Sequence, residues 1–273
     1  MEIKEILNSN NFVFKKKFGQ NFLLDQNILN NIVNLGGIDK DTLVIEIGIG
    51  AGALTNKLAP LAKNVLGYEI DKTLEEPLSE ILKDYDNIDI IFEDFLSRNI
   101  KEDLKKYQYK NLVVVANLPY YITTPIITKF IDEEIDVSKI VVMVQKEVAD
   151  RFSAKPNTKD YNSLTIFLNY YFDIKKAFVV SRNVFYPKPN VDSAVVVFNK
   201  KENRISLTNE KLFFKLVKDS FRQKRKTLKN NLNDYDTETI DKVLSKYDKN
   251  ISSRAETITI DEFADISNEL AKQ

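Results

Sequence analysis

The sequence predicts an α/β protein in which a mostly parallel sheet is followed by a small, all-helical C-terminal domain. Two observations support this fold class. In the first two-thirds of the 273-residue chain, short runs rich in Val and Ile alternate with helical segments, a pattern typical of parallel strands buried on both faces. After Lys200 no strand-like run remains, and the apolar residues recur with helical spacing.

The strands are predicted from short apolar runs with many β-branched residues. They cover residues 42–47, 64–70, 88–92, 111–116 and 139–144. Two further runs follow one another without a helix between them and are expected to form an antiparallel pair at the sheet edge, at 174–180 and 191–198. Asp25 is expected to cap a helix over 26–35. The other helices of this part are expected at 52–62, 74–84 and 125–132.

The C-terminal part is predicted to contain helices over 208–219, 222–233, 236–247 and 259–272. We therefore expect an α/β domain over 1–203, with residues 1–24 as an N-terminal arm, and a helical domain over 204–273. Within the latter, residues 211–230 hold eight Lys or Arg and one Asp. Such a compact basic stretch predicts a face that binds a polyanion, although a solvated charged helix explains it equally well.

The composition excludes several kinds of chemistry. The chain has no Cys, which removes disulfides and thiolate metal sites, and no His, which removes imidazole acid–base catalysis. We expect no metal and a reaction that depends on positioning and electrostatics. The chain has no apolar run of about 18 residues and no apolar signal segment at its N-terminus, so we expect a cytoplasmic protein that does not contact membranes.

A glycine-rich turn follows the first predicted strand, in EIGIGAGALT at 46–55. Gly48, Gly50 and Gly52 allow the backbone to turn sharply and a ligand to approach the main chain closely. The helix that follows directs free N–H groups at such a ligand. A turn that binds no ligand is less well supported, because three glycines at one strand end increase the conformational entropy that the chain loses on folding.

Acidic residues at the ends of the next two strands indicate which ligand binds. Glu69 can bind ribose hydroxyls, but Gly48, Gly50 and Ala53 also fit a dinucleotide-binding loop, so a nicotinamide cofactor stays open on this evidence. Asp94 can accept a hydrogen bond from the exocyclic amine of an adenine ring. Together, the glycine turn and the two acids predict a site for adenosine.

The fourth strand ends in the most specific signal of the chain, Asn117-Leu118-Pro119-Tyr120. The Asn117 side-chain oxygen and the Leu118 carbonyl can accept the hydrogens of an adenine N6 amine and direct its lone pair at a methyl donor. Pro119 restricts the backbone and holds Leu118 out of the helical region. Tyr120 offers a face on which a flipped-out adenine can stack, and Phe185 could stack on its other side. The alternatives are a strand-to-helix turn and, for Phe185, an ordinary core aromatic.

These motifs make the chain resemble ribosomal RNA adenine N6-dimethyltransferases over nearly its whole length. The matching segments are KKKFGQNFLLD (15–25), VIEIGIGAGALT (44–55), YEID (68–71), EDFL (93–96), NLPYYITTPI (117–126), VQKEVADRFSAKPNTKDYNSL (144–164), FYPKPNVDSAVV (185–196), FRQKRKTLKNNL (221–232) and RAETITIDEFADISNEL (254–270).

The resemblance implies a Rossmann-like class I methyltransferase with a seven-stranded sheet. It implies S-adenosylmethionine as cofactor, S-adenosylhomocysteine as product, and cofactor contacts from Asn21, Leu23, Gly48, Gly50, Glu69, Asp94 and Asn117. RNA phosphates would be held by Lys15, Lys16, Lys17, Lys146, Arg222, Lys224, Arg225 and Lys226.

Two branches of the family share the early motifs. AKPNTKDYNSL and the C-terminal motifs look like the housekeeping branch, which dimethylates two adjacent adenines near the 3′ end of 16S ribosomal RNA in the assembling small (30S) subunit. The other branch modifies large-subunit RNA and confers macrolide resistance. A third possibility is an assembly or transcription factor that keeps the fold without catalysis. We expect the first of these, acting as a monomer.

Overall fold

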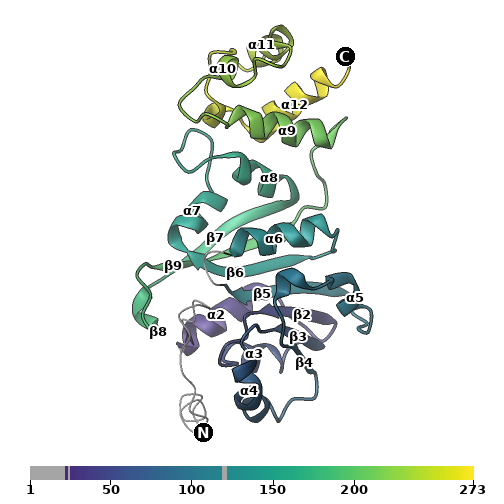
Figure 1. Cartoon of the computed structure of the whole chain (residues 1–273), viewed down its shortest axis with the longest axis vertical. Helices are drawn as coiled ribbons and strands as arrows, with labels where there is room; N and C mark the ends of the chain where they lie inside the picture. The colour runs from purple at the N-terminus through teal and green to yellow at the C-terminus, as the bar shows by residue number, and fades with distance from the viewer. Residues whose placement is uncertain (1–21, 24, 119–121) are drawn as a thin grey trace. The chain divides into compact units, whose positions relative to one another are not determined.

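The structure, a computed structural model, describes residues 22–23, 25–118 and 122–273. The chain forms two compact units, whose ribbons are drawn in Figure 1. The first contains the chain up to Ala149 together with Lys175–Asn199, and the second contains Asp150–Ile174 and Lys200–Gln273.

Seven strands of the described residues form one sheet, in the order β4-β3-β2-β5-β6-β9-β7. Their bounds are β2 Thr42–Ile47, β3 Asn64–Tyr68, β4 Ile88–Ile91, β5 Asn111–Asn117, β6 Lys139–Gln145, β7 Phe172–Val180 and β9 Ser193–Lys200. The first five pair in parallel, and β9 pairs antiparallel with β6. The predicted seven-stranded, mostly parallel sheet is therefore confirmed. The last two strands are neighbours as expected, but only β7 lies at the edge, because β9 is inserted beside β6.

The helices between these strands are α2 Gln26–Gly36, α3 Thr55–Leu58, α4 Glu75–Ile81, α5 Ile100–Leu104, α6 Thr123–Asp132 and α7 Lys146–Phe152. Asp25 caps α2 as predicted, because its side chain accepts hydrogen bonds from the amides of Asn27 and Ile28. The helix predicted over 52–62 is shorter than expected. A separate two-stranded ribbon pairs β1 (Phe22–Leu23) with β8 (Phe185–Tyr186).

Helices cover both faces of the sheet. On one face, Leu29 and Ile32 of α2 share a buried cluster with Val44 of β2 and Val113 of β5. Tyr68 lies on the opposite face from Val65, because successive strand residues alternate. There its ring packs edge-on against Phe95, with ring centroids 5.0 Å apart, and Phe95 packs against Phe130 of α6.

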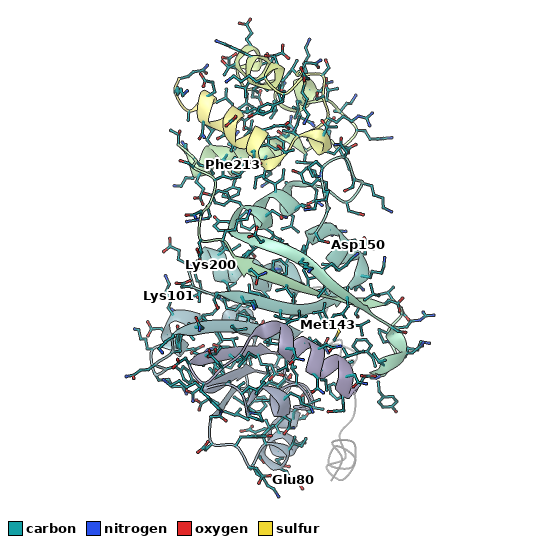
Figure 2. The ribbon with its side chains drawn as sticks, turned by 180° about the vertical axis from the view of Figure 1, so that it is seen from behind. Glu80, Lys101, Met143, Asp150, Lys200 and Phe213 are labelled. Carbon is teal, nitrogen blue, oxygen red and sulfur yellow. The ribbon has the colours of Figure 1, made fainter. Side chains whose placement is uncertain are left out.

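The second unit is helical, with α8 Ser163–Tyr171, α9 Glu210–Ser220, α10 Leu228–Asn231, α11 Thr237–Ser245 and α12 Ile260–Leu270. Residues 150–174 belong to it, although the sequence analysis grouped them with the first domain. The reason is packing, since Tyr161 and Ile166 share a buried cluster with Phe213 of α9, labelled in Figure 2, and Phe263 of α12. Within the described residues, no helix is long and apolar enough to cross a bilayer.

The helix predicted over 222–233 is wrong in its first half, where turns replace it. The side-chain amide of Asn231 donates to the carbonyls of Ser220 and Gln223, 2.7 and 3.2 Å away, and so ties this segment back to the end of α9. Thr227 also forms a β-bridge with Arg254. These partners bend the chain, and helix begins again only at Leu228.

Candidate functional site

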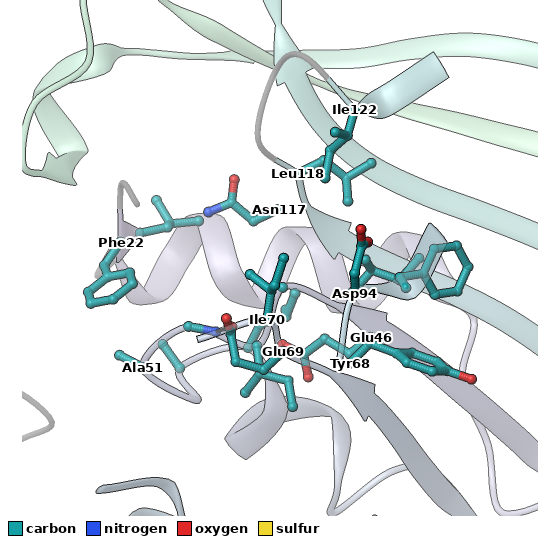
Figure 3. Close-up of a pocket in the computed structure, with 18 of the residues that line it drawn as sticks. Phe22, Glu46, Ala51, Tyr68, Glu69, Ile70, Asp94, Asn117, Leu118 and Ile122 are labelled. Atoms are coloured by element: carbon teal, nitrogen blue, oxygen red, sulfur yellow. Dashed lines mark hydrogen bonds between the residues drawn. The ribbon is translucent and has the colours of Figure 1, made fainter. Parts of the chain in front are cut away.

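The candidate site lies where the carboxyl ends of β2, β3, β4 and β5 meet at one edge of the sheet. A pocket of about 340 Å³ opens there, lined by residues that follow each of these strands. Figure 3 shows Glu69, Asp94 and Asn117 around this pocket, each from a different strand end. Parallel strands bring residues that are far apart in sequence to the same edge, as the sequence analysis predicted.

The glycine turn after β2 forms one wall of the pocket. Gly48 and Gly50 both line it, and both have left-handed backbones, with φ of 75° and 58°. A Cβ atom on Gly50 would also lie 3.0 Å from the ring of Phe22. Glycine is therefore needed at this position both for conformation and for space.

Glu69 joins the glycine turn to the end of β3. One carboxylate oxygen accepts the amide hydrogen of Gly50 at 2.9 Å, and the other accepts that of Asp71 at 2.8 Å. Burial raises the pKa of Glu69, and these amide hydrogen bonds offset part of the increase. The side chain thus organises the turn in addition to the ligand-binding role predicted for it.

Glu46 is a second buried acid in the pocket, and the sequence analysis did not select it. It lies near the end of β2, is 1% exposed, and its Oε2 atom has no hydrogen-bond partner among the described residues. Burial, with a smaller contribution from the charge of Glu69, raises the pKa of Glu46 to about 8. The available signal was an acid inside the otherwise apolar strand TLVIEI.

Asp94 lies beyond the end of β4 and lines the pocket. Its Oδ1 atom accepts the amide hydrogen of Leu96 at 2.9 Å and caps the short 3₁₀ turn Phe95–Ser97. The carboxylate is exposed, so its other oxygen is accessible to a ligand amine.

Ile70, which follows Glu69, lines the same pocket with 46% of its surface exposed and was also missed by the sequence analysis.

Asn117 and Leu118, at the end of β5, line the pocket as well. Leu118 is buried, and its amide donates to the Met143 carbonyl of β6 at 3.3 Å, which anchors the strand end. Pro119 and Tyr120 lie outside the described residues. The carboxyl end of β5 therefore brings Asn117, which is predicted to bind the target amine, beside the predicted cofactor residues.

Two other predicted residues lie at the β1–β8 ribbon. Leu23 lines the pocket and pairs with Phe185 of β8. Phe185 itself is only 6% exposed, belongs to the hydrophobic core with Leu23 and Leu29, and is not among the pocket-lining residues. Its stacking on adenine stays a prediction. Asn21 lies outside the described residues.

The predicted RNA-binding residues fall in separate parts of the chain. Lys15, Lys16 and Lys17 lie outside the described residues, and Lys146 is exposed at the start of α7 in the first unit. In the second unit, the four remaining side chains are exposed on the turns between α9 and α10: Arg222, Lys224, Arg225 and Lys226.

The pocket fits a ligand that combines an adenosine with a positively charged group. Glu69 and Asp94 supply acceptors for hydroxyl and amine hydrogens, and Ile70 supplies an apolar surface for a ring. The unpartnered oxygen of Glu46 adds a buried acceptor beside the glycine turn. Acidic side chains around the pocket disfavour the negatively charged pyrophosphate of a dinucleotide.

Comparison with known proteins agrees with this geometry. The family model described as ribosomal RNA adenine dimethylase matches residues 11–272. The chain is 46% identical to proteins named ribosomal RNA small subunit methyltransferase A from Enterococcus faecalis and from Bacillus cytotoxicus. Each match covers 98% of this chain and 94% of the relative.

Among solved structures, the fold is similar to that of a dimethyladenosine transferase from Plasmodium falciparum. The TM-score is 0.76 at 29% sequence identity, and the match covers 90% of this chain and 95% of the other. The similarity therefore extends through the sheet and into the helical C-terminal unit.

Proposed function

The chain belongs to the ribosomal RNA adenine dimethylase family, and from this premise we propose that it dimethylates N6 of two adjacent adenines near the 3′ end of 16S ribosomal RNA. It is an rRNA adenine dimethyltransferase that uses S-adenosylmethionine. We further propose that its substrate is the assembling small ribosomal subunit in the cytoplasm, that it acts as a monomer, and that it needs no metal.

The chain's residues would catalyse this reaction by positioning the two reactants. S-Adenosylmethionine supplies a methyl group on a positively charged sulfur. This methyl group would pass from the sulfur to N6 of the target adenine, and the methylated amine would release a proton to solvent. The Asn117 side-chain oxygen and the Leu118 carbonyl would accept the N6 hydrogens and direct the lone pair at the methyl carbon.

The observation that carries this proposal is that Asn117 and Leu118 line the same pocket as Glu69 and Asp94. In the proposed complex, Glu69 binds the ribose hydroxyls and Asp94 the amine of the cofactor adenine. Gly48, Gly50 and Leu23 would contact its methionine end, and we expect a further contact from Asn21. Tyr120 and Phe185 would stack on the target base.

The 46% identity to small-subunit methyltransferases favours the housekeeping branch over the branch that modifies large-subunit RNA. We expect N6,N6-dimethyladenosine when the protein is incubated with labelled S-adenosylmethionine and unmethylated small subunits. We expect none with large-subunit RNA. We also expect none with duplex DNA, because a base in a regular duplex must be unstacked at a cost of a few kcal/mol. Mass spectrometry of the digested RNA measures the product. Product in large-subunit RNA alone would contradict the branch, and product in duplex DNA would contradict the substrate class.

The exposed basic turn of the second unit would bind RNA phosphates. Two distant segments lie against it, because Lys224 Nζ donates to the Lys159 carbonyl and Thr227 bridges to Arg254. Other Lys residues of this unit pair with acids, such as Lys215 with Asp219. Among the described residues, by contrast, no ion pair is formed by Lys159, Arg222, Lys224, Arg225, Lys226 or Arg254. Cations that form no ion pair are available to phosphates.

Reversing two of these charges, Arg225→Glu with Lys226→Glu, should weaken binding to the subunit and flatten its dependence on salt. Each lost phosphate contact should lower the log–log salt slope by about 0.7–0.9. Lys224 is left unchanged because its ammonium contacts the Lys159 carbonyl. The matched control reverses Lys242 of α11 and Lys246 at its C-cap, which are both exposed. Binding measured by filter retention at several salt concentrations should change only for the first pair; equal slopes would indicate a merely solvated face.

A further inference from the structure

A hydrogen-bonded chain of four side chains lies beside the pocket, and the proposed reaction does not use it. The Tyr68 hydroxyl donates to Asp103 Oδ2 at 2.9 Å. Arg98 donates to both oxygens of the same carboxylate, from Nε at 3.1 Å and from Nη2 at 2.5 Å. The Nη1 atom of Arg98 then reaches Glu93 Oε2 at 3.0 Å. We call Tyr68, Asp103, Arg98 and Glu93 the latch.

The two ends of the latch immediately precede the two acids of the pocket. Tyr68 is the last residue of β3 and comes before Glu69, while Glu93 comes before Asp94. The ladder between β3 and β4 ends close by, with the Glu69 amide donating to the Ile91 carbonyl at 3.1 Å. Beyond that bond, the latch links the two strand ends through side chains.

The central member of the latch is buried and fixed. The Asp103 side chain is 6% exposed, and Tyr68 is 1% exposed. Burial alone would raise the pKa of Asp103, but hydrogen bonds from Arg98 and Tyr68 outweigh it and hold the pKa below its usual value. A buried carboxylate with a bidentate guanidinium partner and a phenol has a defined geometry.

The helix that carries Asp103 is fixed as well. Asn99 caps α5 by accepting the Glu102 amide hydrogen at 3.2 Å. At the same end of α5, the Ile100 amide donates to Glu133, which follows α6. Glu133 is in turn paired with Lys129. Asp103 is thus a fixed point to which both strand ends are attached.

We propose that Asp103, acting through Arg98 and Tyr68, is a positioning residue that sets the separation of Glu69 and Asp94 and thereby the affinity for the nucleoside end of the methyl donor. This inference rests on the proposed function, because that function assigns the two acids to ribose and adenine. Hydrogen bonds to ribose and adenine need both acceptors at the right spacing, and Glu69 and Asp94 belong to different strand ends. Asp103 itself does not line the pocket and touches no ligand.

The test compares Asp103→Asn with Asp89→Asn. Asp89 is a matched control, because it accepts a hydrogen bond from Tyr107 at 2.6 Å and pairs with Lys106, but lies near the start of β4, away from the pocket. Asp103→Asn should lower the affinity for S-adenosylhomocysteine about tenfold by calorimetry. It should raise the KM for S-adenosylmethionine similarly while leaving kcat within about twofold. Asp89→Asn should leave all three values unchanged.

A double-mutant cycle separates positioning from general damage. In an Asp94→Ala background, Asp103→Asn should cost less affinity than in the wild-type protein, because one of the acids that it positions is already absent. An equal loss in both backgrounds would overturn the proposal. Should Asp103→Asn fold poorly in thermal melts, Tyr68→Phe removes one hydroxyl of the latch and Tyr107→Phe is its control. Unchanged affinity in Tyr68→Phe would then overturn the proposal.

These outcomes are distinct from those that test the proposed function. Wild-type protein that binds S-adenosylhomocysteine but methylates no ribosomal RNA would contradict the function and leave the latch standing. Wild-type protein that methylates small subunits, with Asp103→Asn unchanged in affinity, would overturn the latch alone.

Discussion

Asn117→Ala should lower the single-turnover rate of methyl transfer by about a hundredfold to a thousandfold, the usual cost of removing one acceptor or donor that acts in the transition state. Asn117 lines the pocket at the end of β5. In the proposed reaction its side-chain oxygen accepts a hydrogen of the target amine. Alanine cannot do this, whereas the proposed cofactor contacts of Glu69 and Asp94 remain, so affinity for S-adenosylhomocysteine should fall only modestly.

The matched control for this prediction is Asn111→Ala. Asn111 is the first residue of the same strand and is exposed at the opposite end from the pocket. Rapid quench with labelled S-adenosylmethionine and excess protein measures the chemical step for both variants. Near-normal transfer by Asn117→Ala would refute the positioning mechanism, whereas slow transfer by both variants would indicate damage to the strand.

Glu46→Gln should make the protein more stable at pH 8 and remove much of the pH dependence of its unfolding. Burial raises the pKa of Glu46 to about 8 in the folded chain, from an ordinary 4.5. Between these values the folded state keeps a proton that the unfolded state has lost, so the free energy of unfolding falls as pH rises. The free energy of unfolding of Glu46→Gln, relative to that of the wild type, should therefore increase by on the order of 3 kcal/mol between pH 5 and pH 8.

Urea unfolding at pH 5, 6.5 and 8 measures this difference. Glu80→Gln is the control, because Glu80 is an exposed glutamate on α4, labelled in Figure 2. Its unfolding curve should follow that of the wild type at each pH. If the stabilities of the Glu46→Gln and wild-type proteins changed in parallel with pH, Glu46 would not be the protonated group inferred from its burial.

Much of the fold followed from local patterns. The strands around 42–47 and 139–145 were predicted nearly to their ends, because a strand buried on both faces leaves an apolar run. The edge strand at 88–91 was predicted as well, from its β-branched residues. The pocket also followed, because parallel strands place Gly48, Glu69 and the residues after them at one edge of the sheet. The roles assigned to Phe185 and to the basic residues are still predictions.

The features that the sequence did not reveal depend on partners that are far apart in the chain. The helix predicted over 222–233 gives way to turns because Asn231 and Arg254 bond to this segment. Residues 150–174 join the second unit because their apolar side chains pack against later helices. In the sequence, nothing distinguishes Asp103 from the other acids of a polar stretch. The folded chain places it within hydrogen-bond distance of Tyr68.

The sequence by itself determined the order of strands and helices, the glycine turn and the acids and asparagine at the strand ends. It did so because periodicity and turn chemistry act over a few residues and leave a direct signal. Only the tertiary structure decided that Glu46 is fully buried, that Glu69 holds the glycine turn, and that Asp103 links two strand ends. Long-range hydrogen bonds and the degree of burial of a polar side chain depend on how distant segments pack, which local patterns do not fix.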